Sequence, residues 1–223
     1  MQKRDLQNLM TSVEDKLYVP VVCDVLDALG YRSQAMHQRL RPLDPDNCRF
    51  IGLARTIQWM DIVYVVKEDP YGLELEAMDS LHSGDVIVQS TDYKGTNAPW
   101  GELMVTAAKM RGAVGCVCDS QARDCQKIIA LGFSTFVAGI CPVDSMCRAR
   151  VMAYDVPIMC GNVMVHPGDL IFADFDGVVA IPQKVANRVV DAALEKVSKE
   201  NLSRKELLEG KLLSEVYKKY GVL

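Results

Sequence analysis

Three charged side chains lie near two predicted helix starts in the middle of the chain. Glu102 follows the turn 97–101 and begins a predicted helix over 102–110. Arg123 and Asp124 follow an apolar, β-rich run over 113–118 and belong to a segment, 121–124, that we expect to begin a second helix. Free backbone N–H groups at helix starts favour anions. Acids at both starts, beside an arginine, suit an anion and a divalent cation held side by side.

Each of these residues also has an ordinary structural interpretation. Glu102 and Asp124 can be helix-start acids, each worth roughly 0.3–1 kcal/mol through the helix dipole. Arg123 can be a surface charge. Asp119 can cap the turn after its strand or touch the site, and Asn97 can hold the loop or contact a ligand.

Composition sets broad bounds on the class of protein. The chain has 223 residues, 49% of them hydrophobic and 24% charged, with a net charge of −4. This length can bury one sizeable core, and the charge is not that of a nucleic-acid-binding protein. No apolar run approaches the roughly 18 residues of a membrane span, and the first residues do not resemble a signal peptide. We therefore expect a cytoplasmic protein that binds neither nucleic acid nor membranes.

The cysteines do not form a metal-binding pattern. None of the eight belongs to a C-x-x-C pair, and the chain has only three histidines. Cys116 and Cys118 lie two residues apart on one predicted strand and face the same side. Small buried core side chains are the better interpretation.

Helices and strands alternate along the first two thirds of the chain, which predicts one α/β body. The run 62–66 can be strand or helix. The predicted helices are 5–17, 21–29, 71–81, 102–110 and one beginning at 121; the predicted strands are 50–59, 85–89, 113–118 and 133–140.

The last third is organised differently. Short β runs over 151–165, 170–173 and 178–181 form a predicted meander whose turns contain Gly168 and Gly177. Residues 184–220 form a polar helical tail with a break near Gly210. We expect one domain over 1–183, and a tail over 184–223 that packs on a neighbouring subunit.

Three motifs in order carry a family resemblance. They are N-A-x-W-G-E-L from residue 97, G-x-V-x-D-x-x-x-R-D from residue 115, and P-G-D-L-x-x-x-D-x-D-G-V-V-x-I-P from residue 167. Over about 21–182 the chain resembles the family of class II 4-hydroxy-4-methyl-2-oxoglutarate aldolases and the regulator of ribonuclease activity A. The resemblance implies a single-domain α/β/β/α sandwich of the swivelling phosphohistidine-like type, assembled as a homotrimer or homohexamer.

The aldolase branch implies a chemistry. It cleaves 4-hydroxy-2-oxo acids to pyruvate and a second carbonyl compound, often with oxaloacetate decarboxylase activity. Cleavage leaves an enolate whose charge must be stabilised, and Mg²⁺ or Mn²⁺ does this where no Schiff-base lysine acts. Mg²⁺ needs only one or two protein carboxylates.

The resemblance also implies roles for individual residues. Asp124 would ligate the metal directly, Glu102 would hold a metal-bound water, and Arg123 would donate to the keto or enolate oxygen. The backbone N–H groups of Leu103 and Met104 would receive the substrate carboxylate. Substrate binding is expected at Asn97, Gly101, Leu103, Met104 and Arg123.

The tail has an expected catalytic role through its neighbour. By resemblance to members with a cross-subunit glutamate, Glu200 is the expected base or water-positioning residue at the site of the next subunit. Glu195, Glu206 and Glu209 compete for this role, and all four can be solvated helix charges.

Two departures from the family pattern bear on function. Family members often have Asp-Gly where this chain has Asp119 and Ser120, and some aldolases have Asp where it has Glu102. Ribonuclease-regulator members tend to lack an acid at position 102, so its presence favours the enzyme. The alternatives are a non-catalytic regulator that binds a ribonuclease or RNA helicase, and an enzyme of the same scaffold acting on another oxo acid.

Overall fold

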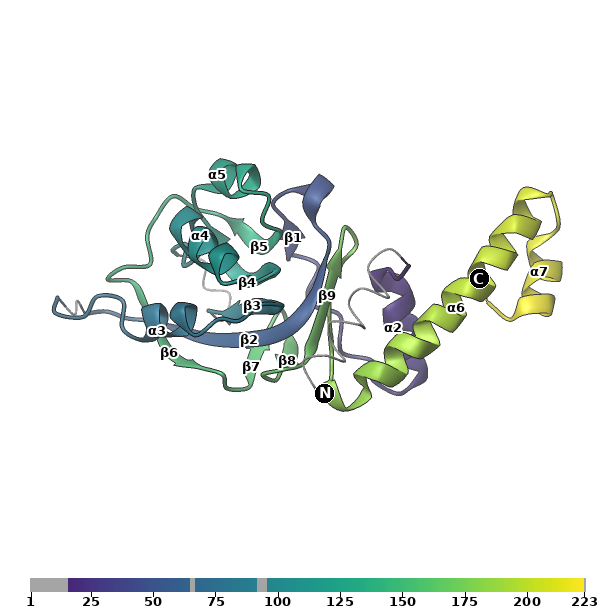
Figure 1. Cartoon of the computed structure of the whole chain (residues 1–223), viewed down its shortest axis with the longest axis horizontal. Coiled ribbons are helices and arrows are strands. Elements are labelled where there is room, and N and C mark those ends of the chain that lie inside the picture. Colours follow the sequence, from purple (N-terminus) through teal and green to yellow (C-terminus); the bar gives the residue numbers. More distant parts are fainter. Residues whose placement is uncertain (1–15, 65–66, 92–95, 223) are drawn as a thin grey trace.

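A curved eight-stranded sheet forms the centre of the molecule (Figure 1). The structure is a computed structural model, and it describes residues 16–64, 67–91 and 96–222. The sheet order is β1-β5-β4-β3-β2-β9-β10, with β6 paired to β2. The sheet strands are β1 (Arg41–Pro42), β2 (Phe50–Asp61), β3 (Asp85–Ser90), β4 (Gly115–Ala122), β5 (Thr135–Ile140), β6 (Ala149–Tyr154), β9 (Leu170–Asp174) and β10 (Gly177–Ile181).

The strands that carry the site are parallel. Strands β2, β3, β4 and β5 pair in parallel register, and the intervening chain forms the helices α3 (Leu73–Asp79), α4 (Glu102–Met110) and α5 (Cys125–Ala130). Strand β3 is buried along its whole length, as expected where both faces of a sheet are covered. The helix starts that follow β3 and β4 therefore meet at one edge of the sheet.

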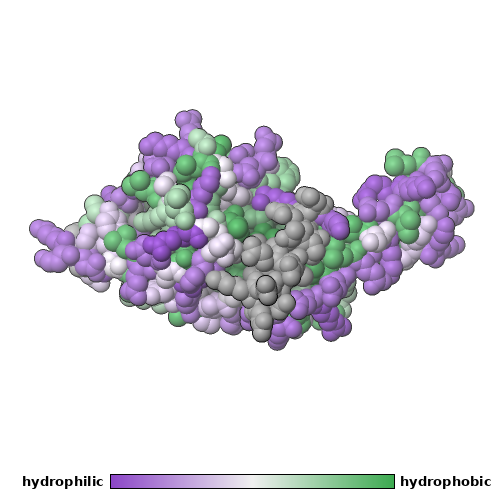
Figure 2. Space-filling model, viewed as in Figure 1, coloured by the Kyte–Doolittle hydropathy of each residue, from purple (hydrophilic) through white to green (hydrophobic). Residues whose placement is uncertain are grey.

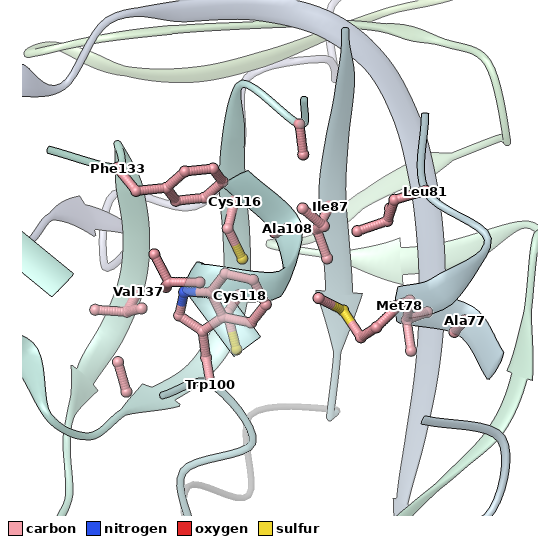
Figure 3. Close-up of a cluster of buried hydrophobic side chains, with 14 of the residues drawn as sticks. Ala77, Met78, Leu81, Ile87, Trp100, Ala108, Cys116, Cys118, Phe133 and Val137 are labelled. Atoms are coloured by element: carbon pink, nitrogen blue, oxygen red, sulfur yellow. The ribbon is translucent and has the colours of Figure 1, made fainter. Parts of the chain in front are cut away.

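Three apolar layers confirm the predicted α/β/β/α arrangement. The outer layer packs α3, α4 and α5 on the sheet, and Figure 3 shows Met78 of α3 pointing between Ile87 and Trp100. The inner layer joins the other face of β3–β5 to the hairpin β7 (Ile158–Cys160) and β8 (Val163–Val165) and to β9 and β10. The third layer joins the opposite face of β9 and β10 to α2 (Val19–Ala28) and α6 (Ala186–Leu208).

Alternation along β9 explains how one strand serves two layers. Ile171 and Ala173 face the inner layer, whereas Leu170 and Phe172 face α2 and α6. Successive side chains of a strand point to opposite faces, so an uninterrupted apolar strand is required where both faces are covered.

Turn residues fix the predicted meander. Asp174 accepts hydrogen bonds from the backbone N–H of Asp176 at 2.9 Å and of Val19 at 2.7 Å, so it holds both the β9–β10 turn and the start of α2. Gly168 has φ +84°, a conformation that favours glycine. The Asp174 carboxylate thus stabilises the turn between β9 and β10.

The tail leaves the body after its first turns. Ala186, Val189, Val190 and Ala193 of α6 pack against α2, and the rest of α6 runs outward to α7 (Leu213–Tyr220), as Figure 1 shows. Gly210, with φ +87°, marks the predicted break between the helices. No helix in the described ranges is long and apolar enough to cross a membrane.

Some predicted boundaries require correction. The strand predicted over 113–118 continues to Ala122, so the helix predicted from 121 begins only at Cys125. Residues 62–64 form neither helix nor strand. The helix predicted over 5–17 and the rest of the run 62–66 fall mainly outside the described residues.

Candidate active site

A cavity of about 430 Å³ lies where α3, the start of α4 and the end of β4 meet. The loop after β5 closes it through Asp144 and Ser145. Five carboxyl groups and one guanidinium from the described residues line it, together with apolar side chains, so its charged groups are mainly acidic. These charged side chains are Glu74, Asp79, Glu102, Asp124, Asp144 and Arg123.

Arg123 lies between two of the carboxylates. Its Nη1 is 3.3 Å from Oδ2 of Asp144, and its Nε is 3.9 Å from Oδ2 of Asp124. All three side chains are about one-third exposed or more, so solvent screens these pairs and they add little to stability. Their consequence is geometric, because they aim the guanidinium into the cavity.

The backbone positions Arg123 through the turn before α4. The N–H of Arg123 donates to the carbonyl of Trp100 at 2.9 Å, and Trp100 pairs with Ala122 as an isolated bridge. Trp100 is 1% exposed and anchors this turn in the outer core layer, beside Cys118 in Figure 3. Two segments far apart in sequence are therefore held together at the edge of the sheet.

Gly101 leaves the space that this approach requires. A Cβ at position 101 would lie 3.2 Å from Cγ and Nε of Arg123 and 3.3 Å from Oδ2 of Asp124. The φ of Gly101 is −148°, which any residue can adopt. Glycine at 101 therefore allows this close approach, and its backbone freedom is not used.

Asp124 has a strained backbone. It lies at the N-cap of α5 with φ +55° and ψ +29°, and its carboxylate makes no capping hydrogen bond. Non-glycine residues adopt this region at a cost, and such outliers cluster at functional sites. The prediction that Asp124 lies within the first turn of a helix is wrong, and its side chain faces the cavity instead.

The start of α4 offers free donors to the cavity. The N–H of Val105 bonds to the carbonyl of Gly101, whereas those of Leu103 and Met104 have no acceptor among the described residues. Both residues line the cavity with Glu102, whose Oε1 accepts a hydrogen bond from Thr106 at 3.0 Å. The structure thus brings together Gly101, Glu102, Leu103, Met104, Arg123 and Asp124.

Asn97 and Asp119 lie behind this site. Asn97 is 3% exposed, and its backbone carbonyl accepts a hydrogen bond from Ser120. Asp119 accepts from the backbone N–H of Thr91 at 2.8 Å and from the Ser90 hydroxyl at 2.8 Å. Neither residue lines the cavity. These contacts favour the alternative in which Asn97 holds the loop and Asp119 caps the turn after its strand, rather than contact with a ligand.

Glu200 lies on α6, away from the cavity of its own chain (Figure 1). Its side chain is 11% exposed and its nearest ion partner is Lys196, at 4.0 Å. Burial raises the pKa of this carboxyl above its ordinary value. Any catalytic role for Glu200 therefore requires a second copy of the chain, as the prediction states.

Glu74 and Asp144 were missed by the sequence reasoning. Glu74 lies in the first turn of α3 and is 6% exposed, on the face that also buries Ala77 and Met78. Burial, assisted by the Asp144 carboxylate and opposed by Arg123, raises the pKa of Glu74 to about 8. The signal was present, since an acid at 74 interrupts the apolar positions 77, 78 and 81. Nothing in the sequence marked Asp144.

The carboxylates of the cavity fit a divalent cation that keeps most of its waters, rather than a site in which the protein supplies every ligand. Although five carboxyl groups line the cavity, the described residues contain no group of three or more His, Cys, Asp or Glu side chains that could together hold a metal ion. Mg²⁺ needs one or two carboxylates and keeps several waters. Asp124 has an uncapped carboxylate facing the cavity, and the excess of acids over Arg123 there favours a cation.

The fold and the cavity define the class: an α/β/β/α protein with a cavity lined by acids and an arginine at a helix start. Residues 19–180 match the family model RraA-like, described as Aldolase/RraA. The chain belongs to this RraA-like family.

Three relatives illustrate the family. The chain is 34% identical over 180 residues, 80% of both chains, to a Halalkalibacterium halodurans protein provisionally named 4-hydroxy-4-methyl-2-oxoglutarate aldolase. An uncharacterised Pseudomonas syringae protein superposes with a TM-score of 0.84 at 27% identity, over 96% of this chain and 94% of the other. Streptomyces coelicolor RraAS2, described as an unusual member of the RNase ES inhibitor RraA family, superposes with a TM-score of 0.77 at 30% identity, over 88% and 96%.

Proposed function

We propose that the protein is a divalent-metal-dependent lyase that cleaves 4-hydroxy-2-oxo acids to pyruvate and decarboxylates oxaloacetate. The observation that carries this is the placement of Arg123, between two carboxylates and opposite the free N–H groups of α4, in one cavity. The family membership and the provisional aldolase name of the relative support the same reaction class.

Different residues of the cavity would bind different groups of a 2-oxo acid. The N–H groups of Leu103 and Met104 would bind the substrate carboxylate at the positive end of α4. The guanidinium of Arg123 would donate to the 2-oxo oxygen, where negative charge develops as the enolate forms. Asp124 would hold Mg²⁺ or Mn²⁺, with Glu102 binding one of its waters, and the cation would supply further electrostatic stabilisation of that charge.

The contribution of Arg123 is greatest in the transition state. The 2-oxo oxygen is neutral in the substrate and becomes anionic as the C3–C4 bond breaks. A fixed cation at that oxygen therefore stabilises the transition state more than the ground state. Asp144 restricts the guanidinium to this orientation at 3.3 Å.

Turnover of defined substrates tests the proposal. Wild-type protein with Mg²⁺ should release pyruvate from 4-hydroxy-4-methyl-2-oxoglutarate and from oxaloacetate, measured with lactate dehydrogenase. Asp124→Asn should lose at least about 10²-fold in kcat/KM. Absence of pyruvate from both substrates would reject the lyase and favour the regulator, a role supported by the name of the similar RraAS2 structure.

We further propose that the tail of one copy approaches the site of another and supplies Glu200. The tail projects from the body, and Figure 2 shows apolar surface at its tip. The exposed apolar side chains of the tail are Leu202, Leu208, Leu212, Leu213 and Tyr217. Light scattering should give a trimer or hexamer for the intact chain, and a fully active monomer would reject this assembly.

A further inference from the structure

The first turn of helix α3 buries a glutamate and exposes two leucines. Glu74 is 6% exposed, whereas its neighbours Leu73 and Leu75 are 36% and 52% exposed. Burying a carboxyl and exposing two leucines opposes the usual partition of side chains, because a charge loses its hydration on burial. Packing alone would have favoured an apolar residue at 74 beside Ala77 and Met78.

No hydrogen bond or ion pair from the described residues compensates for this burial. Among the described residues the Glu74 carboxyl has neither a hydrogen-bond donor nor an ion pair, although its backbone N–H bonds to the carbonyl of Tyr71. By contrast, Glu76 on the solvent side of the same helix binds the Tyr154 hydroxyl. The Glu74 side chain lines the cavity, so its free oxygens are available to a molecule bound there.

Glu74 shares its cavity with apolar wall and with hydrogen-bond donors. The apolar wall comes from Leu75, Met78 and Ala107, and the donors are the free N–H groups at the start of α4. The charged groups that act on Glu74 are Asp144, from the loop after β5, and Arg123, from the end of β4. Tyr71 and Asp79 of α3 line the same cavity.

We propose that Glu74 binds the C4 hydroxyl of the 4-hydroxy-2-oxo acid and accepts its proton as the C3–C4 bond breaks. The inference rests on the proposed function and names the residue that selects substrates with this hydroxyl. The O–H electron pair becomes the second bond of the new C4 carbonyl, and the C3–C4 pair becomes the enolate of pyruvate. Glu74 then loses this proton to solvent, and the enolate takes a proton from water at C3, so the protein is unchanged after each turnover.

The acid–base properties of Glu74 suit this exchange. A pKa raised to about 8 by burial makes its carboxylate a stronger base than an exposed glutamate, and its acid form populated near neutral pH. A group with a pKa near the working pH can both take and give a proton.

Oxaloacetate provides an internal comparison. It has no C4 hydroxyl and releases CO₂ from its C4 carboxylate, so its cleavage needs no base at that position. Glu74→Gln keeps the side-chain volume and removes the base. With Mg²⁺ present, we expect it to lower kcat for 4-hydroxy-4-methyl-2-oxoglutarate by about 10²-fold or more and to keep oxaloacetate decarboxylation within about threefold. Glu76→Gln on the same helix is the matched control and should change neither reaction.

Binding of oxalate, a planar mimic of the pyruvate enolate, tests whether the variant site is intact. Calorimetry with Mg²⁺ should give the same Kd for wild type and Glu74→Gln within about twofold. Equal loss of both reactions in Glu74→Gln, or loss of neither, would overturn the role of Glu74 while leaving the lyase standing. A wild type that turns over neither substrate would reject the lyase and this inference together.

Discussion

Oδ2 of Asp144 lies 3.3 Å from Nη1 of Arg123, although the two residues belong to segments on either side of β5. The backbone around Asp144 is itself fixed, because Asp144 pairs with Ala98 as an isolated bridge beside the turn that leads into α4. The orientation of the guanidinium thus depends on three chain segments. This explains why a single motif does not describe the site.

Replacing Arg123 with lysine should lower kcat rather than raise KM. Lysine keeps the positive charge but not the planar fork that reaches two carboxylates and an oxyanion at once. We expect kcat to fall by about 10²-fold or more. Steady-state kinetics would check this, with Arg41→Lys on β1 as a control outside the cavity. A change in KM alone would show that Arg123 only binds substrate.

Gly101→Ala should impair catalysis without unfolding the protein. The added Cβ would lie 3.2 Å from Arg123, tighter than ordinary van der Waals contact, so the guanidinium stem must shift by a few tenths of an ångström. A 1 Å misplacement of a catalytic group costs about 10²-fold in rate, so this smaller shift should lower kcat by about threefold to tenfold. The ordinary backbone conformation at 101 predicts a Tm within about 2 °C of wild type. A fully active Gly101→Ala would show that the close approach is not needed.

Glu74→Gln should stabilise the protein increasingly as the pH rises. The folded-state pKa of Glu74 is raised to about 8 from an ordinary value near 4.5, so the folded state binds more protons between these values. Wild-type stability therefore falls across this window, and glutamine removes that loss. Thermal unfolding at pH 5 and pH 8.5 should show a Tm difference between variant and wild type that grows with pH. A constant difference would contradict a buried acid at this position.

The Glu206 carboxylate should stabilise the packing of α7 on α6, and this stabilisation should be lost at low pH. It forms ion pairs with Lys211 and Lys219 and accepts a hydrogen bond from Tyr220, and these contacts lower its pKa to about 2. Its contribution is complete above an ordinary pKa near 4.5 and is lost as the pH falls toward 2. Glu206→Gln should increase hydrogen exchange in α7 at pH 7, with Glu195→Gln as control. Unchanged exchange would show that α7 is held by apolar packing of Val216, which is fully buried, rather than by Glu206.

The order of elements could be predicted because hydrophobic periodicity follows secondary structure. Helix 102–110 was predicted with its observed bounds, and the strand beginning at Phe50 agrees with β2 except at its end. The error at 121–124 has a physical cause: the end of β4 continues because Gln121 and Ala122 pair with β5, and Ala122 also pairs with Trp100 before α4. Local sequence does not contain that long-range contact.

The site could be predicted only in part. Motifs found Glu102, Arg123 and Asp124 because helix starts and family spacing are local features, and the structure places all three at one cavity. Asp144 approaches through the fold, after β5, and no local pattern marks it. Glu74 was recognisable as an acid among buried helix positions, but only a structure shows that its carboxyl faces a cavity.

Metal dependence of pyruvate release tests the central claim most directly. Protein treated with EDTA should release no pyruvate from oxaloacetate above the uncatalysed rate, and added Mg²⁺ or Mn²⁺ should restore turnover in a saturable manner. Asp124→Asn should require much more metal for half-maximal activity, whereas Asp79→Asn, which alters an acid of the same cavity paired with Arg111, should match wild type. Full activity of metal-free protein, or an Asp124→Asn variant with unchanged metal dependence, would contradict the account.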